Sequence, residues 1–164
     1  MPITIEATPE SQANTRRMDD MIRSLRSPSP EMVAGVGGDV RIGFMENFRN
    51  QRAGDGPAWA ALRPFTVRER ARLGYGPRPI LIRTGSYMRS FTDRLGTDHI
   101  TRWRIAGNGW ELEEGSTDSR VSELEGGRAN MFARPVTILS AQSETRIGVT
   151  ITNLLNRLFT ERGF

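Results

Sequence analysis

Residues 48–90 decide the fold and read FRNQRAGDGPAWAALRPFTVRERARLGYGPRPILIRTGSYMRS. Asp55-Gly56-Pro57 combines a side chain that bonds its own backbone, a residue that tolerates positive φ and one that fixes φ. This combination predicts a sharp turn after a helix that ends near Gln51. Thr66-Val67-Arg68-Glu69 has the capping-box pattern, in which the Thr hydroxyl and the Glu carboxylate satisfy reciprocal backbone donors. It predicts the start of a short helix, which ends by Pro77.

A second short helix is predicted at the end of this stretch. Thr84 can cap it, and Tyr87, Met88 and Phe91 are spaced to bury one face. The loop before these helices carries apolar residues that we expect to pin it to the core, with direct contact to a partner as the alternative. These residues are Trp59, Leu62 and Phe65.

The same stretch resembles the signature segment of the phage virion morphogenesis family. That pattern runs from a helix ending in Phe, through a Gly-containing loop, a Trp and a Leu, to a Thr that opens a short helix, then Ile-Leu, Thr-Gly and Ser. The matching positions here are Phe48, Gly56, Trp59, Leu62, Thr66, Ile80, Leu81, Thr84, Gly85 and Ser90. Ala133-Arg134-Pro135 resembles the element that precedes the last helix of the family. Two positions depart from the pattern: Tyr87 replaces a usual leucine, and residues 123–126 replace a His-Gln pair before a Gly.

The resemblance implies a structural virion protein of a tailed phage or prophage. Such a protein forms a ring at the neck, or head-tail connector, or completes the end of the tail; a tail terminator is the alternative. The implied partners are copies of itself, for which we expect a hexamer, neighbouring head-closure, connector and tail proteins, and genomic DNA that passes without sequence-specific binding. We expect assembly in the host cytoplasm and a final location in the virion.

Ring closure needs a head-to-tail contact, and such contacts favour arginine and aromatic anchors. We therefore expect the loop from Arg52 to Arg83 and the arm from Ser116 to Arg128 to lie at interfaces. The interface candidates are Trp59, Arg63, Arg68, Arg83, Arg128 and Arg134, and Arg134 should bond backbone or carboxylate groups nearby. Acidic residues should lie nearer the channel, because a lumen coated with arginine would grip the passing phosphates. The lumen candidates are Glu123 and Glu125.

The charge composition permits nucleic-acid contact without demanding it. All 23 basic residues are arginine, and the formal net charge is +4 because 19 acids are interleaved with them. A basic nucleic-acid-binding module is therefore the less favoured alternative function. It would show a steep salt dependence of DNA binding.

Enzymatic chemistry has little support in the sequence. The chain has no cysteine and one histidine, His99, which we expect to be exposed and structural. Neither a metal cluster nor a catalytic triad can be assembled from this set, so we predict no enzyme and no cofactor. No apolar run approaches the roughly 20 residues of a membrane span, and the start of the chain lacks the features of a signal peptide. We expect no membrane partner.

The remaining patterns predict a single α+β domain over residues 1–164, with residues 1–29 as a peripheral strand and helix. Ile3 and Ile5 alternate with polar residues, which indicates a short strand, and a helical stripe of Met18, Met21, Ile22 and Leu25 follows. Ser29 and Pro30 indicate the start of a second helix, which carries Val33, Val36, Val40, Phe44 and Phe48 on one face. Its glycines should cost about 1 kcal/mol each unless close packing offsets that.

A β-hairpin is predicted around Asn108-Gly109, pairing Ile105 with Leu112. Trp103, Ile105, Trp110 and Leu112 then share one face, while Arg102, Arg104, Glu111 and Glu113 share the other, and Glu114 is also expected in solvent. Residues 115–130 read as an exposed loop or β-arm. The last helix carries Ile147, Ile151, Leu154, Leu155 and Leu158, with Ser140 or Ser143 as its cap and Gly163 as its end. We expect this helix and the hairpin, an antiparallel sheet packed on long helices, to form the core.

Overall fold

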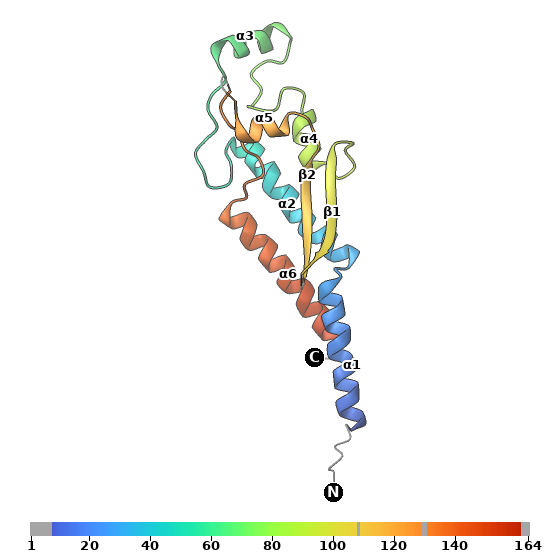
Figure 1. Ribbon diagram of the computed structural model, residues 1–164. Helices are drawn as coiled ribbons and strands as arrows, with labels where there is room; N and C mark the ends of the chain where they lie inside the picture. Colours follow the sequence, from blue (N-terminus) through green and yellow to red (C-terminus); the bar gives the residue numbers. More distant parts are fainter. Residues whose placement is uncertain (1–7, 108, 129–130, 162–164) are drawn as a thin grey trace.

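The computed structural model describes residues 8–107, 109–128 and 131–161. Within these ranges the elements are α1 (Pro9–Arg26), α2 (Pro30–Asn50), α3 (Pro64–Arg72), α4 (Ser86–Thr92), β1 (His99–Ala106), β2 (Gly109–Ser116), α5 (Val121–Gly126) and α6 (Ala141–Glu161). The predicted α+β class is confirmed. Figure 1 shows an elongated molecule with α1 and α3 at opposite ends. The strand predicted at Ile3 and Ile5 lies outside the described residues.

The central element is α2, with α6 along one side and the hairpin and α4 on the other (Figure 1). It begins as predicted: Ser29 Oγ accepts a hydrogen bond from Met32 N at 3.1 Å, and Pro30 takes the first helical position. The predicted turn after it is also confirmed, since Gly56 N donates to Ala53 O at 2.8 Å. A side-chain cap thus fixes the start of α2, and a backbone turn follows its end.

An aromatic cluster forms the core at the C-terminal half of α2. Phe44 and Phe48 from α2 meet Tyr87 and Phe91 from α4, and all four are buried. The ring centroids of Phe44 and Phe91 lie 5.5 Å apart, and those of Tyr87 and Phe91 lie 5.3 Å apart, in edge-on geometries that aromatic quadrupoles favour. The prediction that Tyr87 and Phe91 face the core is confirmed.

Close packing explains some of the glycines in α2. A Cβ at Gly43 would lie 2.6 Å from Leu139 Cδ2 and 3.1 Å from Ser143 Oγ, so the absence of a side chain lets the start of α6 approach α2. A Cβ at Gly37 would meet Glu114 Oε2 at 3.0 Å. At Gly38 the nearest group would be the end of an arginine side chain at 3.8 Å. Close packing can therefore offset the helix-propensity cost of glycine at Gly43 and Gly37, but not at Gly38.

The hairpin has the predicted faces but a different register. Ile105 pairs with Trp110, and Trp103 pairs with Leu112, a shift of two residues that leaves the alternation intact. The connection consists of Gly107, at φ 56°, and position 108, so the expected turn residue Asn108 lies outside the described residues. A left-handed glycine can open the two-residue turn, which favours this register.

The core differs from the predicted one. The hairpin lies on α2 and α4, whereas α6 lies on another side of α2, so the two do not form a common core. Trp110 is only half-buried, and Trp103 and Ile105 are 44% and 62% exposed. In α6, Ser143 is the one buried residue, and Ile147 and Ile151 are half-buried.

Several helix boundaries also correct the sequence predictions. Helix α3 begins at Pro64 with Arg63 at the N-cap, two residues before Thr66, because proline suits the first helical position. Helix α4 has Gly85 at its N-cap, while Thr84 Oγ1 accepts from Ser86 N at 3.3 Å. Within the segment expected to be an exposed loop or arm, residues 121–126 form α5, whose Leu124 is buried. The Ser140 cap of α6 is confirmed by a 3.1 Å bond from Ser143 N, and Gly163 lies outside the described residues.

Candidate interface at the arginine-rich end

The loop between α2 and α3 is pinned to the core by Trp59. Its ring lies 6.0 Å from that of Phe48, it is 7% exposed, and its Nε1 donates to Pro135 O at 3.1 Å. The core interpretation of Trp59 is confirmed, and Leu62 is half-buried. The same interpretation of Phe65 is wrong: its side chain is 68% exposed, and no residue of α3 is buried.

Asn47, on α2, holds two loops together beneath this end. Its Nδ2 donates to Val136 O and to Ile138 O, both at 2.7 Å, and its Oδ1 accepts from Gly54 N at 2.9 Å. The side chain thus satisfies three backbone groups from two segments far apart in sequence. Sequence reasoning missed this residue, because the partners lie 89 and 91 residues away from it along the chain.

Arg134 is a second anchor. It is 7% exposed, and its Nη2 and Nε donate to Ala60 O at 3.0 and 3.3 Å, while Nη1 donates to Phe132 O at 3.4 Å. The expected backbone bonding is confirmed, and the place of Arg134 at an interface stays a prediction. Burial lowers the pKa of its guanidinium from the usual value. The Arg134 guanidinium therefore fixes the loop before α3 against the segment before α6.

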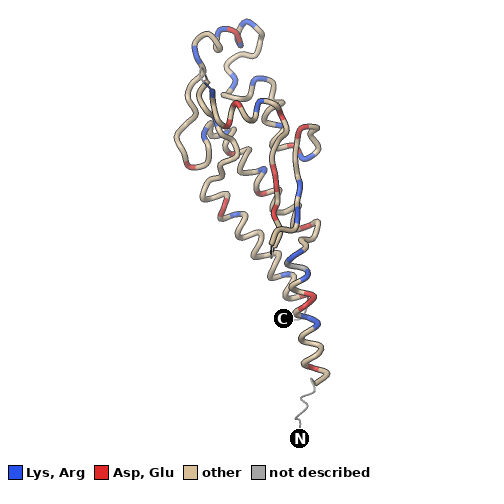
Figure 2. Tube along the Cα trace, in the orientation of Figure 1, with Lys and Arg blue, Asp and Glu red and all other residues tan. Residues whose placement is uncertain are grey.

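The other arginine candidates lie on and around α3, at the end of the molecule away from α1 (Figure 2). Arg63, Arg68 and Arg83 are exposed. The Arg83 guanidinium lies over the Tyr75 ring, 5.3 Å from its centroid. Among the described residues none of these three arginines forms an ion pair. The predicted interface loop is therefore exposed and basic, and its contact with a partner stays a prediction.

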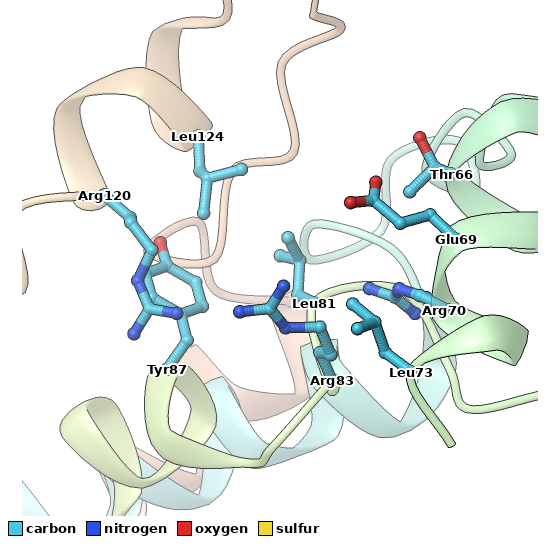
Figure 3. A pocket seen from close by; sticks show the side chains of 9 residues that line it. All are labelled: Thr66, Glu69, Arg70, Leu73, Leu81, Arg83, Tyr87, Arg120 and Leu124. Carbon is cyan, nitrogen blue, oxygen red and sulfur yellow. The ribbon is translucent and has the colours of Figure 1, made fainter. Parts of the chain in front are cut away.

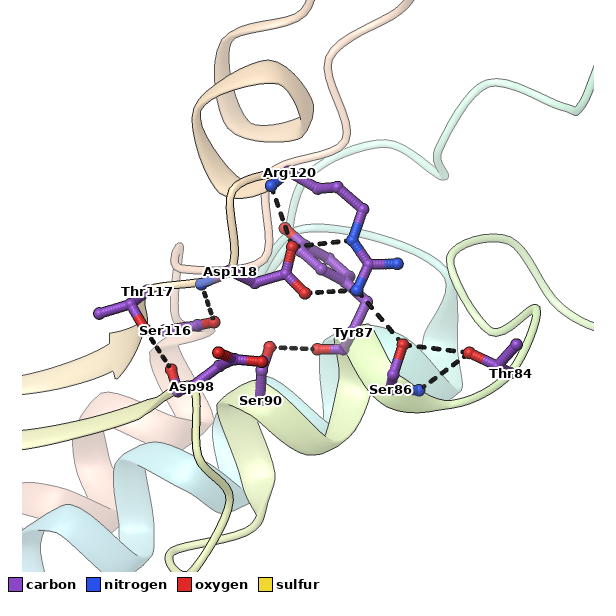
Figure 4. A network of polar contacts seen from close by, with 9 residues as sticks. All are labelled: Thr84, Ser86, Tyr87, Ser90, Asp98, Ser116, Thr117, Asp118 and Arg120. Carbon is purple, nitrogen blue, oxygen red and sulfur yellow. Dashed lines mark hydrogen bonds and ion pairs between the residues drawn. The ribbon is translucent and has the colours of Figure 1, made fainter.

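A polar network joins α4 to the start of α5 (Figure 4). Arg120 Nε donates to Asp118 Oδ1 at 2.7 Å, its Nη2 donates to Ser86 Oγ at 3.2 Å, and its guanidinium lies 5.1 Å from the Tyr87 ring centroid. The hydrogen bond from Arg120 lowers the pKa of Asp118. Burial raises the pKa of Tyr87, whose Oη has no hydrogen-bond partner among the described residues.

The two lumen candidates both lie on α5 and are engaged within the chain. Glu123 Oε1 forms an ion pair with Arg128 Nη1 at 2.8 Å. The lumen candidate Glu123 and the interface candidate Arg128 are therefore in direct contact. Glu125 accepts from Val136 N at 2.7 Å and from Thr137 Oγ1 at 2.8 Å. Glu125 therefore ties α5 to the segment before α6.

A buried polar cluster links the hairpin to α2, and it corrects two predictions of exposure. Glu114 accepts from Arg41, from His99 Nε2 at 2.8 Å and from Thr101 Oγ1 at 3.0 Å; the His99 and Glu114 side chains are each 2% exposed. His99 Nδ1 lies 3.1 Å from Ser90 O. The His99 ring therefore links a backbone carbonyl of α4 to the carboxylate on β2.

The alternation of the hairpin could have revealed the inward position of Glu114. Position 114 has the same parity as Trp110 and Leu112, which places it on the inner face, and the register puts it opposite Thr101. The Thr101 hydroxyl donates to Glu114 Oε2 at 3.0 Å and so ties β1 to the carboxylate on β2. We assign the cluster a structural role.

Within residues 8–161, apart from the undescribed positions, no three or more His, Asp and Glu side chains come together in a way that could hold a metal ion. None of the described helices combines the length and the apolar composition of a membrane span.

The profile of the phage virion morphogenesis family matches residues 10–156 of the 164. The chain belongs to this family. It is therefore a structural or assembly protein of a phage virion. Comparison of this virion morphogenesis protein with curated proteins and with solved structures finds no match. The resemblance seen in residues 48–90 is confirmed over most of the chain.

Proposed function

We propose that this protein forms a ring at the neck, in the head-tail connector, or completes the end of the tail, and so joins head to tail. Family membership supports a role in the virion. The elongated shape supports a subunit that meets neighbours at both of its ends (Figure 1). Function in such a protein is the geometry of interfaces.

The observation that carries the proposal is a pair of different apolar surfaces at opposite ends. On α3, Phe65 and Val67 are 68% and 51% exposed; on α1, at the other end, Met18 and Ile22 are 51% and 42% exposed. Exposed apolar surface at both ends of an elongated subunit is suited to contacts with other molecules. Two unlike surfaces suit a head-to-tail contact, which closes into a ring when the rotation between subunits allows it.

We expect a hexameric ring, with the loop from Arg52 to Arg83 and the arm from Ser116 to Arg128 at contacts between subunits or with neighbouring virion proteins. Glu123 and Glu125 lie on α5, and their position near the channel stays a prediction. DNA would pass through the ring without sequence-specific binding. A tail terminator would use the same kind of ring at a different place in the particle.

Deletion of the gene tests the proposal in the phage itself. We expect separate heads and tails, and images of complemented particles should show the protein at the neck or at the end of the tail. The double substitution F65S and V67S on α3 should give a folded monomer that fails to complement. The matched control L95S changes a residue that is 92% exposed on the α4–β1 loop and should complement. Infectious particles that lack the protein would refute the role.

A further inference from the structure

A cleft separates α3 from the body of the molecule. It consists of two adjoining hollows of about 310 and 410 Å³ that share Thr66, Arg70, Leu81 and Leu124. Figure 3 shows one hollow, with Thr66 and Glu69 on the α3 side, Leu124 on the α5 side and Arg83 between them. Arg70 holds α3 in place by donating to two backbone carbonyls at the base, at 3.2 Å each. The cleft is therefore a built feature of this end.

The lining combines an apolar floor with a ring of arginines. The apolar residues include Leu62, Leu81, Leu124 and Phe132. The arginines are Arg63, Arg70, Arg83, Arg120, Arg128 and Arg134. The lining holds a single acid, Glu69, which forms no ion pair within the described part of the chain.

Most of this positive charge is left without a carboxylate. Arg120 pairs with Asp118, and Arg128 pairs with Glu123. The other four arginines have no carboxylate within ion-pair distance among the described residues. Burial, then the neighbouring charges of Arg83 and Arg134, lower the pKa of Arg70. The cleft is thus electrostatically incomplete in the isolated chain.

We propose that this cleft binds a segment of a different virion protein, in which a carboxylate side chain is flanked by apolar residues. A guanidinium fork pairs with a carboxylate through two parallel hydrogen bonds, and Leu81 and Leu124 would cover the apolar side chains. A DNA backbone has no apolar group to cover such a floor. Each copy of this chain has 19 acids against 23 arginines, so a second copy offers no surplus of carboxylates to the cleft. The inference rests on the proposed function, because it requires a neighbour in the particle.

Photo-crosslinking in assembled particles tests this assignment. A photoreactive amino acid in place of Phe132, which lines the cleft, should form a crosslink to another virion protein, within about one helical turn or a few extended residues of an Asp or Glu. The same group in place of Leu95, outside the cleft, should not give this product. A crosslink to DNA, to a second copy of this chain or to a segment without acids would overturn the proposal.

The arginines provide the second arm of the test. Replacing both Arg63 and Arg83 by Gln should lower the crosslink yield about tenfold, as expected for the loss of two charge-assisted contacts. R102Q is the matched control, because it removes an exposed arginine on β1, and it should leave the yield unchanged. An unchanged yield in the double variant would overturn the proposal. If the protein is present and essential in particles but the expected crosslink is not obtained, only the proposal for the cleft is refuted. If particles are infectious without the protein, the proposed function is refuted.

Discussion

The substitution Asn47→Asp tests the central hydrogen-bonding role of Asn47 with a change of one functional group. Asn47 is 4% exposed and donates to Val136 O and Ile138 O. Aspartate keeps the acceptor for Gly54 N but replaces the donor by an oxygen that faces two carbonyl oxygens. Each unsatisfied buried group costs about 1–3 kcal/mol. We therefore expect the free energy of unfolding to fall by about 3–5 kcal/mol, a large part of the roughly 5–15 kcal/mol of a typical domain.

The measurement is chemical denaturation of wild type, N47D and the control N153D, which makes the same change at an exposed position of α6. The control should change stability by less than about 0.5 kcal/mol. Burial beside two carbonyls raises the pKa of the introduced carboxyl group in the folded N47D variant above its unfolded value of about 4. The cost of N47D should therefore be smallest below pH about 4 and should grow as the pH rises through the folded pKa. A loss below about 1 kcal/mol at neutral pH would refute the role assigned to Asn47.

Three further predictions concern single side chains of the core and its polar network. Y87F should leave stability unchanged or raise it by up to about 1 kcal/mol, because the Oη of Tyr87 has no partner among the described residues; a loss above about 1 kcal/mol in thermal melts would argue against this. G43A should destabilise by roughly 1–3 kcal/mol through its clash with Leu139, whereas G38A should stabilise by about 0.5–1 kcal/mol, and the opposite ranking in urea melts would contradict the packing. D118N should lose the stabilisation that Asp118 gains from its lowered pKa. The difference in the free energy of unfolding between wild type and D118N should be full above pH about 4 and should disappear as the pH falls through the folded pKa of Asp118. A difference independent of pH would count against the ion pair.

Local patterns predicted the features that depend on neighbours in sequence. The start of α2 at Ser29 and Pro30 and the cap of α6 at Ser140 need only side chains within three residues; the first is predicted correctly, and Ser140 is one of the two caps that the sequence offers for α6. The faces of the hairpin followed from alternation, which a shift of two residues preserves. The start of α3 was predicted wrongly because two local signals compete there, and Pro64 at the first helical position prevails over the capping box.

Features that depend on distant contacts could not be predicted. Arg41 and Glu114 are 73 residues apart, and Asn47 and Val136 are 89 apart, so no local pattern links them. The exposure of Trp103, Ile105 and Phe65 depends on which elements cover the hairpin and α3, and periodicity carries no information on that covering. Of the predicted site residues, the structure brings Arg63, Arg83, Arg128 and Arg134 to one cleft, although the sequence suggested no pocket there.

The exposure of α1 has a consequence for helix–coil equilibrium. Residues 8–19 are all exposed, so most of this 18-residue helix lacks the tertiary packing that usually stabilises helices of its length. Its stability in the isolated chain then depends on the cap at Thr8 and on intrinsic propensity, which leaves its first turns open to fraying. A neighbour that covers Met18 and Ile22 would shift this equilibrium towards helix. Assembly should therefore appear in far-ultraviolet circular dichroism as a gain of helical signal, in proportion to the fraction of subunits that have found their neighbours.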